Sequence, residues 1–191
     1  MTYSRVVDHH SMVFDANRNE AYAHAIRQLV RPGSVVLDLG AGLGLHGLLA
    51  AAAGAARVYL VEPQGVVQTA LEAARAAGFA DRIVVLQERI EDVQLPEPVD
   101  LIVSVFTGNL LFSEDLLPSL FHARDRYLKP GGSLLPDRAE LWLAPLSAPN
   151  LHDKHVARWQ DPVMGLDYSS ARALAANEIL WLRRDEFAGA T

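Results

Sequence analysis

Residues 34–47, SVVLDLGAGLGLHG, have the types and spacing of a nucleotide-binding turn. An apolar run ends at Asp38 and is followed by glycines at positions 40, 42 and 44, a pattern typical of a strand, a tight turn and a helix. Glu62 ends the next apolar run, RVYLVE, about twenty residues later, where the end of a strand can present a carboxylate to ribose hydroxyls. The sequence therefore predicts a site for a nucleoside-containing cofactor, formed by Asp38, Gly40, Gly42, Gly44 and Glu62.

Of the nucleoside cofactors, S-adenosylmethionine suits this turn best. The turn reads D-x-G-x-G-x-G, and the dinucleotide fingerprint does not require an acid two residues before its first glycine. A dinucleotide places phosphates against helix N-terminal amides, whereas a cofactor with a cationic sulfonium and an amino-acid tail tolerates a nearby carboxylate. Asp38 can accept a hydrogen bond from the amino group of this cofactor or orient the turn. Two alternatives stay open: glycines used only for their backbone conformation, and a NAD-dependent dehydrogenase.

Composition and charge narrow the class of protein. The 191 residues are half hydrophobic, which allows a sizeable core, and the net charge of −6 comes without a stripe of Lys or Arg. We therefore expect no nucleic-acid partner and a basic peptide or cationic small molecule instead. The first twenty residues are polar and the longest apolar stretch is too short and too rich in Ala and Gly for a membrane span, which predicts a soluble cytoplasmic protein.

A metal centre is not expected. The chain has no cysteine, and the two histidine pairs, His9-His10 and His152-x-x-His155, lack a third ligand at a suitable spacing.

The elements that must position the site follow from apolar patterning. Residues 14–30 have helical spacing, with Asp15 or Asn17 as a cap, and predict one helix before the glycine turn. Apolar runs then alternate with helical segments, which predicts an α/β fold, a doubly wound, Rossmann-like domain with a parallel sheet, and a short C-terminal appendage that contains strands. The expected strands are 35–39, 57–62, 82–87, 99–104, 133–146 and 177–182, and the expected helices after the turn are 45–55, 65–78 and 111–128, the last followed by a KPGG turn. We divide the chain into an N-terminal helical segment (1–33), a Rossmann-like cofactor-binding domain (34–136) and a C-terminal segment (137–191).

Several separated segments resemble protein arginine methyltransferases, from about residue 3 to about residue 169. The segment HHSMVFDANRNEAY is similar to the H-x-x-M-x-x-D-x-x-R-x-x-x-Y segment that folds over the cofactor in this family. The resemblance implies that Arg18 pairs with the methionine carboxylate of the cofactor and that Met12 packs near its methyl-sulfur end. Ile90 and Glu91, in RIEDVQLP, match the residues that read the adenine, and ARDRYLKPGGSLLPDRA matches the segment after the catalytic loop.

The catalytic segment departs from the family pattern. Family members carry two glutamates in S-E-W-M-G-(x)5-E, whereas here the first position is Val105 and the second is Glu114. In the family this pair grips the guanidinium of the substrate, through parallel hydrogen bonds that suit a carboxylate. The resemblance therefore implies an N-methyltransferase with Glu114 as the catalytic residue. It also implies that Ser104, Glu114 and Met12 lie at the substrate and that Ser104 borders the cofactor.

The absence of one glutamate leaves the acceptor open. The first alternative is methylation of a small molecule or a peptide group other than arginine. The second is a pseudoenzyme or partner subunit that binds the cofactor without turnover. The chain also ends before the β-barrel of the family, and the region around Trp159 and residues 163–169 resembles the start of the family's dimerisation arm, so a homodimer is an expectation. The resemblance thus implies that residues 1–33 are a lid over the cofactor and that residues 137–191 are part of a barrel and dimerisation arm.

Overall fold

The structure is a computed structural model that describes residues 4–106, 111–112, 114–180 and 182. It divides into two units, Met1–Leu141 and Trp142–Thr191, which are considered separately. The finer division of the chain at residues 33 and 136 stays a prediction.

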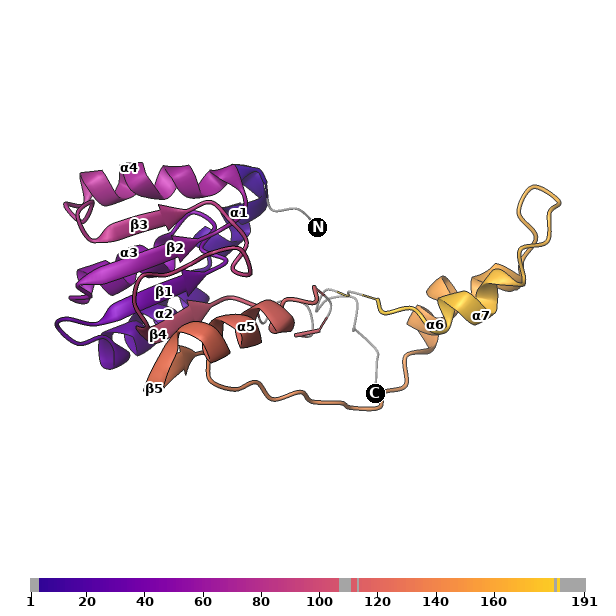
Figure 1. The fold of residues 1–191 in the computed structure, drawn as a ribbon. Coiled ribbons are helices and arrows are strands. Elements are labelled where there is room, and N and C mark those ends of the chain that lie inside the picture. Colours follow the sequence, from indigo (N-terminus) through magenta and orange to yellow (C-terminus); the bar gives the residue numbers. More distant parts are fainter. Residues whose placement is uncertain (1–3, 107–110, 113, 181, 183–191) are drawn as a thin grey trace. The chain divides into compact units, whose positions relative to one another are not determined.

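The first unit contains five parallel strands in the order β3-β2-β1-β4-β5 (Figure 1). Its elements are α1 (Val6–Val13), α2 (Ala16–Leu29), β1 (Val35–Leu39), α3 (Leu45–Ala52), β2 (Arg57–Val61), the 3-10 helix η1 (Gly65–Val67), α4 (Gln68–Ala76), β3 (Ile83–Leu86), β4 (Val99–Ser104), α5 (Leu117–Tyr127) and β5 (Leu128–Leu135). The predicted α/β fold class with a parallel sheet is confirmed.

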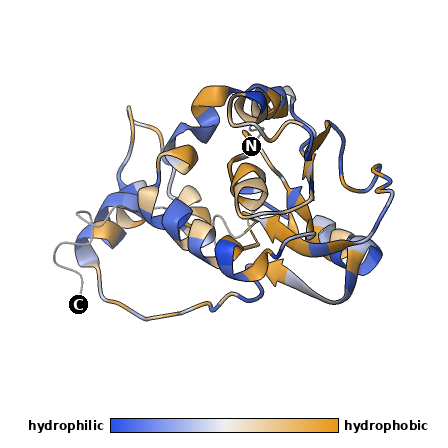
Figure 2. Ribbon diagram, turned by 90° about the vertical axis from the view of Figure 1, so that its left-hand side faces the viewer, coloured by the Kyte–Doolittle hydropathy of each residue, from blue (hydrophilic) through white to orange (hydrophobic). Residues whose placement is uncertain are grey.

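The core lies on both faces of the sheet, as expected for strands that are apolar throughout. All five residues of β1 are buried, and its neighbours β2 and β4 are almost as deeply covered. One apolar cluster joins the sheet to α2, α3 and α4 through Ile26, Ala50 and Ala70, and the other joins it to α5 through Ala123 and Tyr127. Figure 2 shows the corresponding concentration of hydrophobic residues in the strands.

The N-terminal region differs from its prediction, because two helices precede the glycine turn instead of one. Helix α1 ends at Val13, and Asp15 then caps α2 by accepting a hydrogen bond from the backbone N–H of Arg18 (3.1 Å). Of the two predicted caps, Asp15 is the one used.

Two further predictions along the chain are wrong in detail. Helix α5 begins at Leu117 and not near residue 111, and the predicted KPGG turn lies inside β5. The pairing of β5 with β4 jumps from Val99 opposite Leu128 to Leu101 opposite Ser133, so the register shifts between these two pairs.

The second unit contains α6 (Pro149–His155), the 3-10 helix η2 (Ala157–Gln160) and α7 (Ala171–Ala175). The predicted strands over 140–146 and 177–182 are wrong, because the described residues of both segments form neither helix nor strand. The second segment begins in a turn at residue 177. An alternating apolar pattern stabilises a strand only where a neighbour supplies hydrogen bonds, and no described strand pairs with these segments.

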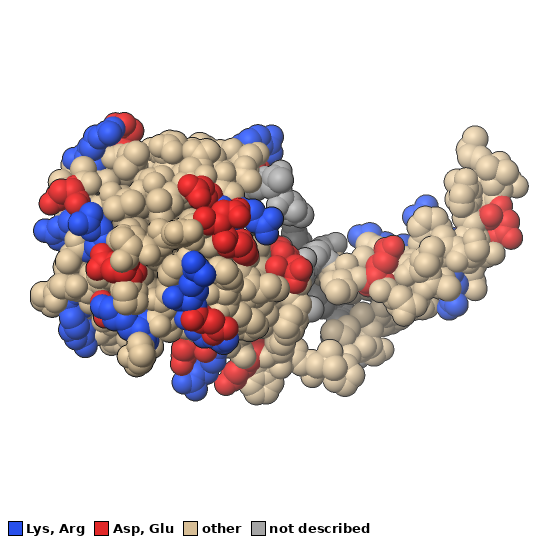
Figure 3. Space-filling view, in the orientation of Figure 1, with Lys and Arg blue, Asp and Glu red and all other residues tan. Residues whose placement is uncertain are grey.

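Charge is mixed over the surface. Figure 3 shows Lys and Arg interspersed with Asp and Glu on the face in view, without a basic stripe. Within the described residues, no helix is both long and apolar enough to cross a membrane.

Candidate functional site

The glycine turn lies between β1 and α3, at the carboxyl end of the sheet. The backbone N–H groups of Gly40 and Ala41 both donate to the carbonyl of Val61 (2.9 and 3.1 Å), which fixes the turn to the end of β2. The φ angles at positions 40, 42 and 44 are +68°, +54° and +80°, a left-handed conformation that favours glycine. The predicted strand, turn and helix are therefore present.

A different element covers each glycine of the turn. A Cβ atom on Gly40 would lie 2.5 Å from the ring of Phe106, and one on Gly44 would lie 2.5 Å from the side chain of Ala70 in α4. A Cβ atom on Gly42 would lie 2.8 Å from Nδ1 of His9, in α1. Close packing as well as backbone conformation therefore requires glycine at these positions.

Asp38 connects β1 to the start of α3. Its Oδ2 accepts a hydrogen bond from the backbone N–H of Gly47 (2.7 Å), a group in the first turn of α3 whose N-cap, Gly44, has no side chain to offer. Burial raises the pKa of Asp38 to about 7, with a further contribution from the charge of Glu62 and a partial offset from the Gly47 hydrogen bond. The described contact of Asp38 thus orients the turn and helix, one of the two roles considered from the sequence.

Glu62 follows β2 and lies directly against the turn. Its Oε2 accepts from the backbone N–H of Gly42 (3.1 Å) and its Oε1 from that of Gln64 (2.9 Å). The structure therefore brings together Glu62 and Gly42, which are twenty residues apart. Each carboxylate oxygen has a second lone pair that can accept a hydrogen bond from a hydroxyl group.

Arg18 joins the two N-terminal helices. Its Nη2 donates to the carbonyl of Met12, and Asn19 donates to the carbonyls of Met12 (3.2 Å) and Val13 (2.7 Å). The last carbonyls of α1, which have no partner within their own helix, are thereby satisfied by side chains of α2. Nε of Arg18 is buried and has no hydrogen-bond partner among the described residues.

Tyr22 links Ser104 to His46. Sequence reasoning placed neither Tyr22 nor His46 in the site. Tyr22, on α2, donates from its hydroxyl to the carbonyl of Ser104 (2.9 Å), at the end of β4. The ring of Tyr22 packs on that of His46, in the first turn of α3, with 4.4 Å between centroids. Burial, together with the charge of Arg18, lowers the pKa of His46 to about 4.

The predicted adenine-reading residues have different environments. Ile90 is 3% exposed and belongs to the core cluster that includes α5. The carboxylate of Glu91 accepts a hydrogen bond from Ser119 of α5 and pairs with Arg89 (3.4 Å); the Ser119 hydrogen bond is the main reason that its pKa is lowered. No described contact joins Glu91 to the glycine turn.

The segment that is predicted to be catalytic is only partly described. Val105 and Phe106 follow β4 and are half-buried, whereas residues 107–110 and 113 lie outside the described residues. Glu114 is half-buried in a turn three residues before the start of α5, and no acidic residue lies in the first turn of that helix. Among the described residues, no group of three or more His, Cys, Asp or Glu side chains has the arrangement of a metal site.

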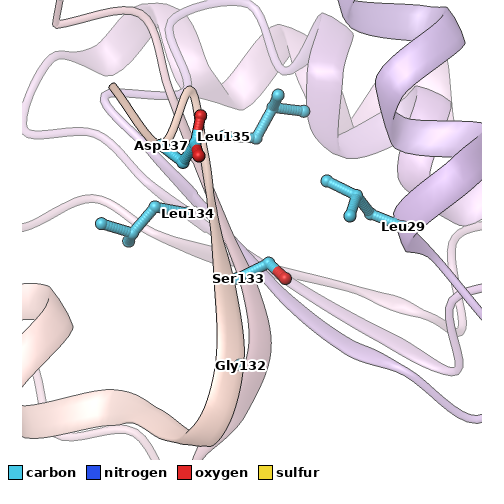
Figure 4. A pocket seen from close by; sticks show the side chains of 6 residues that line it. All are labelled: Leu29, Gly132, Ser133, Leu134, Leu135 and Asp137. Atoms are coloured by element: carbon cyan, nitrogen blue, oxygen red, sulfur yellow. The ribbon is translucent and has the colours of Figure 1, made fainter. Parts of the chain in front are cut away.

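A pocket of about 480 Å³ lies at the outer edge of the sheet (Figure 4). Leu29 of α2 and Leu135 of β5 lie on one side of β5, while Leu134 points to the other side. Gly132, Ser133 and Asp137 complete its lining, which includes none of the predicted site residues.

A family description matches the part of the chain that carries the glycine turn. Residues 36–132 match the family described as "Methyltransferase domain". The chain belongs to this methyltransferase family. This finding favours methyl transfer over the dehydrogenase alternative.

The curated relatives of the chain indicate which kind of methyltransferase it resembles. A probable protein arginine N-methyltransferase 6 from Arabidopsis thaliana is 40% identical over 91% of this chain, and protein arginine N-methyltransferase 2 from Dictyostelium discoideum is 35% identical over 94%. The chain covers 40% and 35% of those two relatives, so it spans less than half of their length. Over its methyltransferase domain the chain resembles class I, S-adenosylmethionine-dependent protein arginine methyltransferases.

Solved structures agree with this assignment. The Trypanosoma brucei PRMT1 enzyme-prozyme heterotetrameric complex with AdoHcy matches 97% of this chain and 59% of its own, with a TM-score of 0.88 and 30% identity. Protein arginine methyltransferase 10 of Arabidopsis thaliana matches 91% of this chain and 54% of its own, with a TM-score of 0.76 and 32% identity.

His9 is the clearest candidate that sequence reasoning missed. We considered it only as half of a histidine pair for a metal, yet it is the first residue of the H-x-x-M segment. It is only 6% exposed to solvent, and its ring lies next to Gly42. Its place in that segment was the available signal.

Proposed function

We propose that this methyltransferase binds S-adenosylmethionine and transfers its methyl group to a nitrogen acceptor held near Glu114. The hydrogen bond between Gly42 and Glu62 is the observation that carries the proposal, because it joins the turn to the ribose-binding acid in one site. The relative from Trypanosoma brucei, in complex with AdoHcy, supports the same cofactor.

The residues present fit this cofactor. Nε of Arg18 is buried without an acceptor among the described residues, and a carboxylate on the amino-acid end of the cofactor supplies one. Glu62 accepts the ribose hydroxyls, and the glycine turn admits the cofactor next to the backbone. The family resemblance, and no described contact, assigns Ile90 and Glu91 to the adenine and Ser104 and Met12 to the reacting end. Asp38 holds the turn through Gly47.

The bound cofactor supplies an electrophilic methyl group on a sulfonium. Arg18, Glu62 and the glycine turn would hold this cofactor, which would supply the methyl group for transfer to the acceptor nitrogen. Glu114 orients the acceptor and takes the proton that the nitrogen loses. Since methyl transfer needs little covalent help, this chain acts mainly by positioning the acceptor and excluding water.

Val105 determines what the acceptor site can hold. A guanidinium in the family meets two carboxylates, and without one of them it loses a charged contact of ~1.5–3 kcal/mol, while a cation beside valine remains poorly solvated. We therefore propose slow methylation of arginine, with a small molecule or a peptide nitrogen or oxygen as the alternative acceptor.

A second candidate function is that of a cofactor-binding partner subunit without turnover. Val105, in place of a catalytic glutamate, favours this function, and the trypanosomal structure, an enzyme-prozyme complex, offers a precedent in a relative.

A homodimer is also proposed, because Trp142, Leu143 and Met164 of the second unit are 89%, 99% and 95% exposed. We expect no nucleic-acid or membrane partner, and the cytoplasmic localisation stays a prediction.

Calorimetric titration with S-adenosylhomocysteine tests the cofactor. We expect binding by the wild type and a loss of at least tenfold in affinity for Arg18→Ala, since a charge-assisted contact contributes ~1.5–3 kcal/mol. Asn19→Ala is the matched control: it removes hydrogen bonds from α2 to the end of α1 without removing the guanidinium. Equal losses in the two variants would assign Arg18 a role in anchoring α1 only, and no binding by the wild type would contradict the proposal.

Methylation of an arginine-containing peptide tests the acceptor. We expect Val105→Glu to raise the rate by about ten- to a hundredfold, in line with one restored charged contact. Val105→Gln is the control, because glutamine has nearly the shape of glutamate without its charge, and this variant should give no comparable gain in rate. If Val105→Glu is no faster than wild type, residue 105 does not limit the reaction with arginine.

A further inference from the structure

Two nitrogen atoms near the glycine turn are buried without a partner. Nε2 of His46 and Nε of Arg18 each lack a hydrogen bond to any described residue. Water cannot readily replace that bond at His46, because the residue is only 6% exposed to solvent. A buried polar atom without a partner lowers the stability of the folded state. Such atoms therefore indicate a partner that the chain itself does not provide.

The fold brings these two side chains to the same place. Arg18 and Tyr22 are four residues apart on α2, so they lie on one face of that helix. Helix α2 packs against α3, and the ring of Tyr22 contacts that of His46. The charge of Arg18 also acts on His46, which places the guanidinium near the imidazole.

The chemistry of the two atoms identifies the missing partner as an acceptor. Nε of arginine can only donate, and a neutral histidine can donate from Nε2. The low pKa of His46 keeps its ring neutral at physiological pH, so it adds a directed hydrogen bond and not a second positive charge. A carboxylate has two oxygens and can accept from both side chains.

We propose that His46 is a cofactor-binding residue whose Nε2–H donates to the carboxylate on the amino-acid end of the cofactor, beside Arg18. The proposal rests on the proposed function, since it assigns a further contact within that site. His46 remains neutral in this role, and the positive charge comes from Arg18 alone.

The test compares three variants with two ligands by calorimetric titration. His46→Leu removes the nitrogen and keeps an apolar side chain, and His46→Gln keeps an N–H donor at the end of the side chain. His155→Leu is the matched control, because Nε2 of His155 is also buried without a described partner but lies in the second unit. The ligands are S-adenosylhomocysteine and its decarboxylated analogue, which keeps the amine and the adenosine.

We expect His46→Leu to weaken binding of S-adenosylhomocysteine about tenfold and to leave binding of the decarboxylated analogue unchanged. His46→Gln should retain most of the affinity, and His155→Leu all of it. Thermal unfolding of His46→Leu should occur at the wild-type temperature or above, since the variant removes an unpaired buried nitrogen. If this variant does not fold, His46→Asn, whose amide stops short of the Nε2 position, replaces it with the same expectation for binding.

Two results would overturn the inference while leaving the proposed function intact. One is wild-type affinity of His46→Leu for S-adenosylhomocysteine, and the other is an equal loss for both ligands, which would mean that His46 only holds the turn in place. If wild-type protein binds neither ligand, the proposed function itself fails, together with this inference.

Discussion

Asp38 is a carboxyl group that folding transfers from water to the interior of the protein. Burial raises its pKa from 3.8 to about 7, so between these values the folded state binds a proton that the unfolded state releases. The contribution of Asp38 to the free energy of unfolding is therefore full below pH 4 and is lost as the pH rises through 7.

Asp38→Asn should remove this pH dependence. The amide oxygen of asparagine can still accept from Gly47, but the side chain does not titrate. Between pH 5 and pH 8 we expect the free energy of unfolding of the wild type to fall by about 2 kcal/mol relative to the variant. Urea denaturation of both proteins at the two values measures this difference, and parallel pH profiles would refute the prediction.

Single residues differed in how far the sequence revealed them. Asp38, the three glycines and Glu62 were identified because their chemistry depends on short spacings along the chain. Tyr22 and His46 were not assigned to the site, because Tyr22 contacts a carbonyl 82 residues away and His46 contacts Tyr22 only where α2 meets α3. The position of Arg18 came from a family resemblance and not from its own neighbourhood in sequence.

The contact between α3 and β2 depends on one glycine inside a helix. Alanine at position 47 would raise helix propensity by about 1 kcal/mol. However, its Cβ would lie 2.2 Å from Cδ2 of Leu60 and 3.1 Å from Oδ2 of Asp38. Close packing therefore decides the outcome at this position.

Gly47→Ala should lower the free energy of unfolding by about 1–3 kcal/mol, the usual range for an overpacked core. Gly65→Ala is a suitable control, since the nearest atom to its Cβ would be 3.6 Å away, and we expect it to change stability by no more than about 0.5 kcal/mol. Chemical denaturation of the two variants compares them, and equal stabilities would show that α3 can shift without cost.

At the scale of elements, buried strands were the most predictable. Strands β1 to β4 fall within a residue of their predicted bounds, because each is a short apolar run between polar residues. Helix α1 was missed because its last two carbonyls, those of Met12 and Val13, depend on side chains of α2 for their hydrogen bonds. The strands expected over 140–146 and 177–182 failed because the described chain offers them no neighbouring strand.

Within the described residues of the whole molecule, the core lies in one unit. Both apolar clusters consist of residues before position 136, and α6, η2 and α7 contain no buried residue. Residues 1–141 alone should therefore unfold cooperatively near the temperature of the full chain and bind S-adenosylhomocysteine as tightly. They should also self-associate less, since Trp142, Leu143 and Met164 are removed. Scanning calorimetry and sedimentation test this, and loss of the cooperative transition would show that the second unit is needed for folding.

The order of the strands was beyond sequence reasoning. Alternating helices and strands predict a parallel sheet, but the placement of β1 between β2 and β4 depends on which crossover packs where. That placement nevertheless forms the candidate site, because β1, β2 and β4 end side by side and bring Asp38, Glu62 and Ser104 together.

The contact between His9 and Gly42 has a kinetic meaning. The turn is already held in shape by β2 and by Phe106, so little of it has to be ordered when a ligand arrives. Helix α1 lies against that turn and is joined to α2 through Arg18 and Asn19. At the proposed site we therefore expect the residence time of a ligand to depend on how often α1 detaches, so that the same helix would retain the cofactor and limit how quickly the spent cofactor leaves.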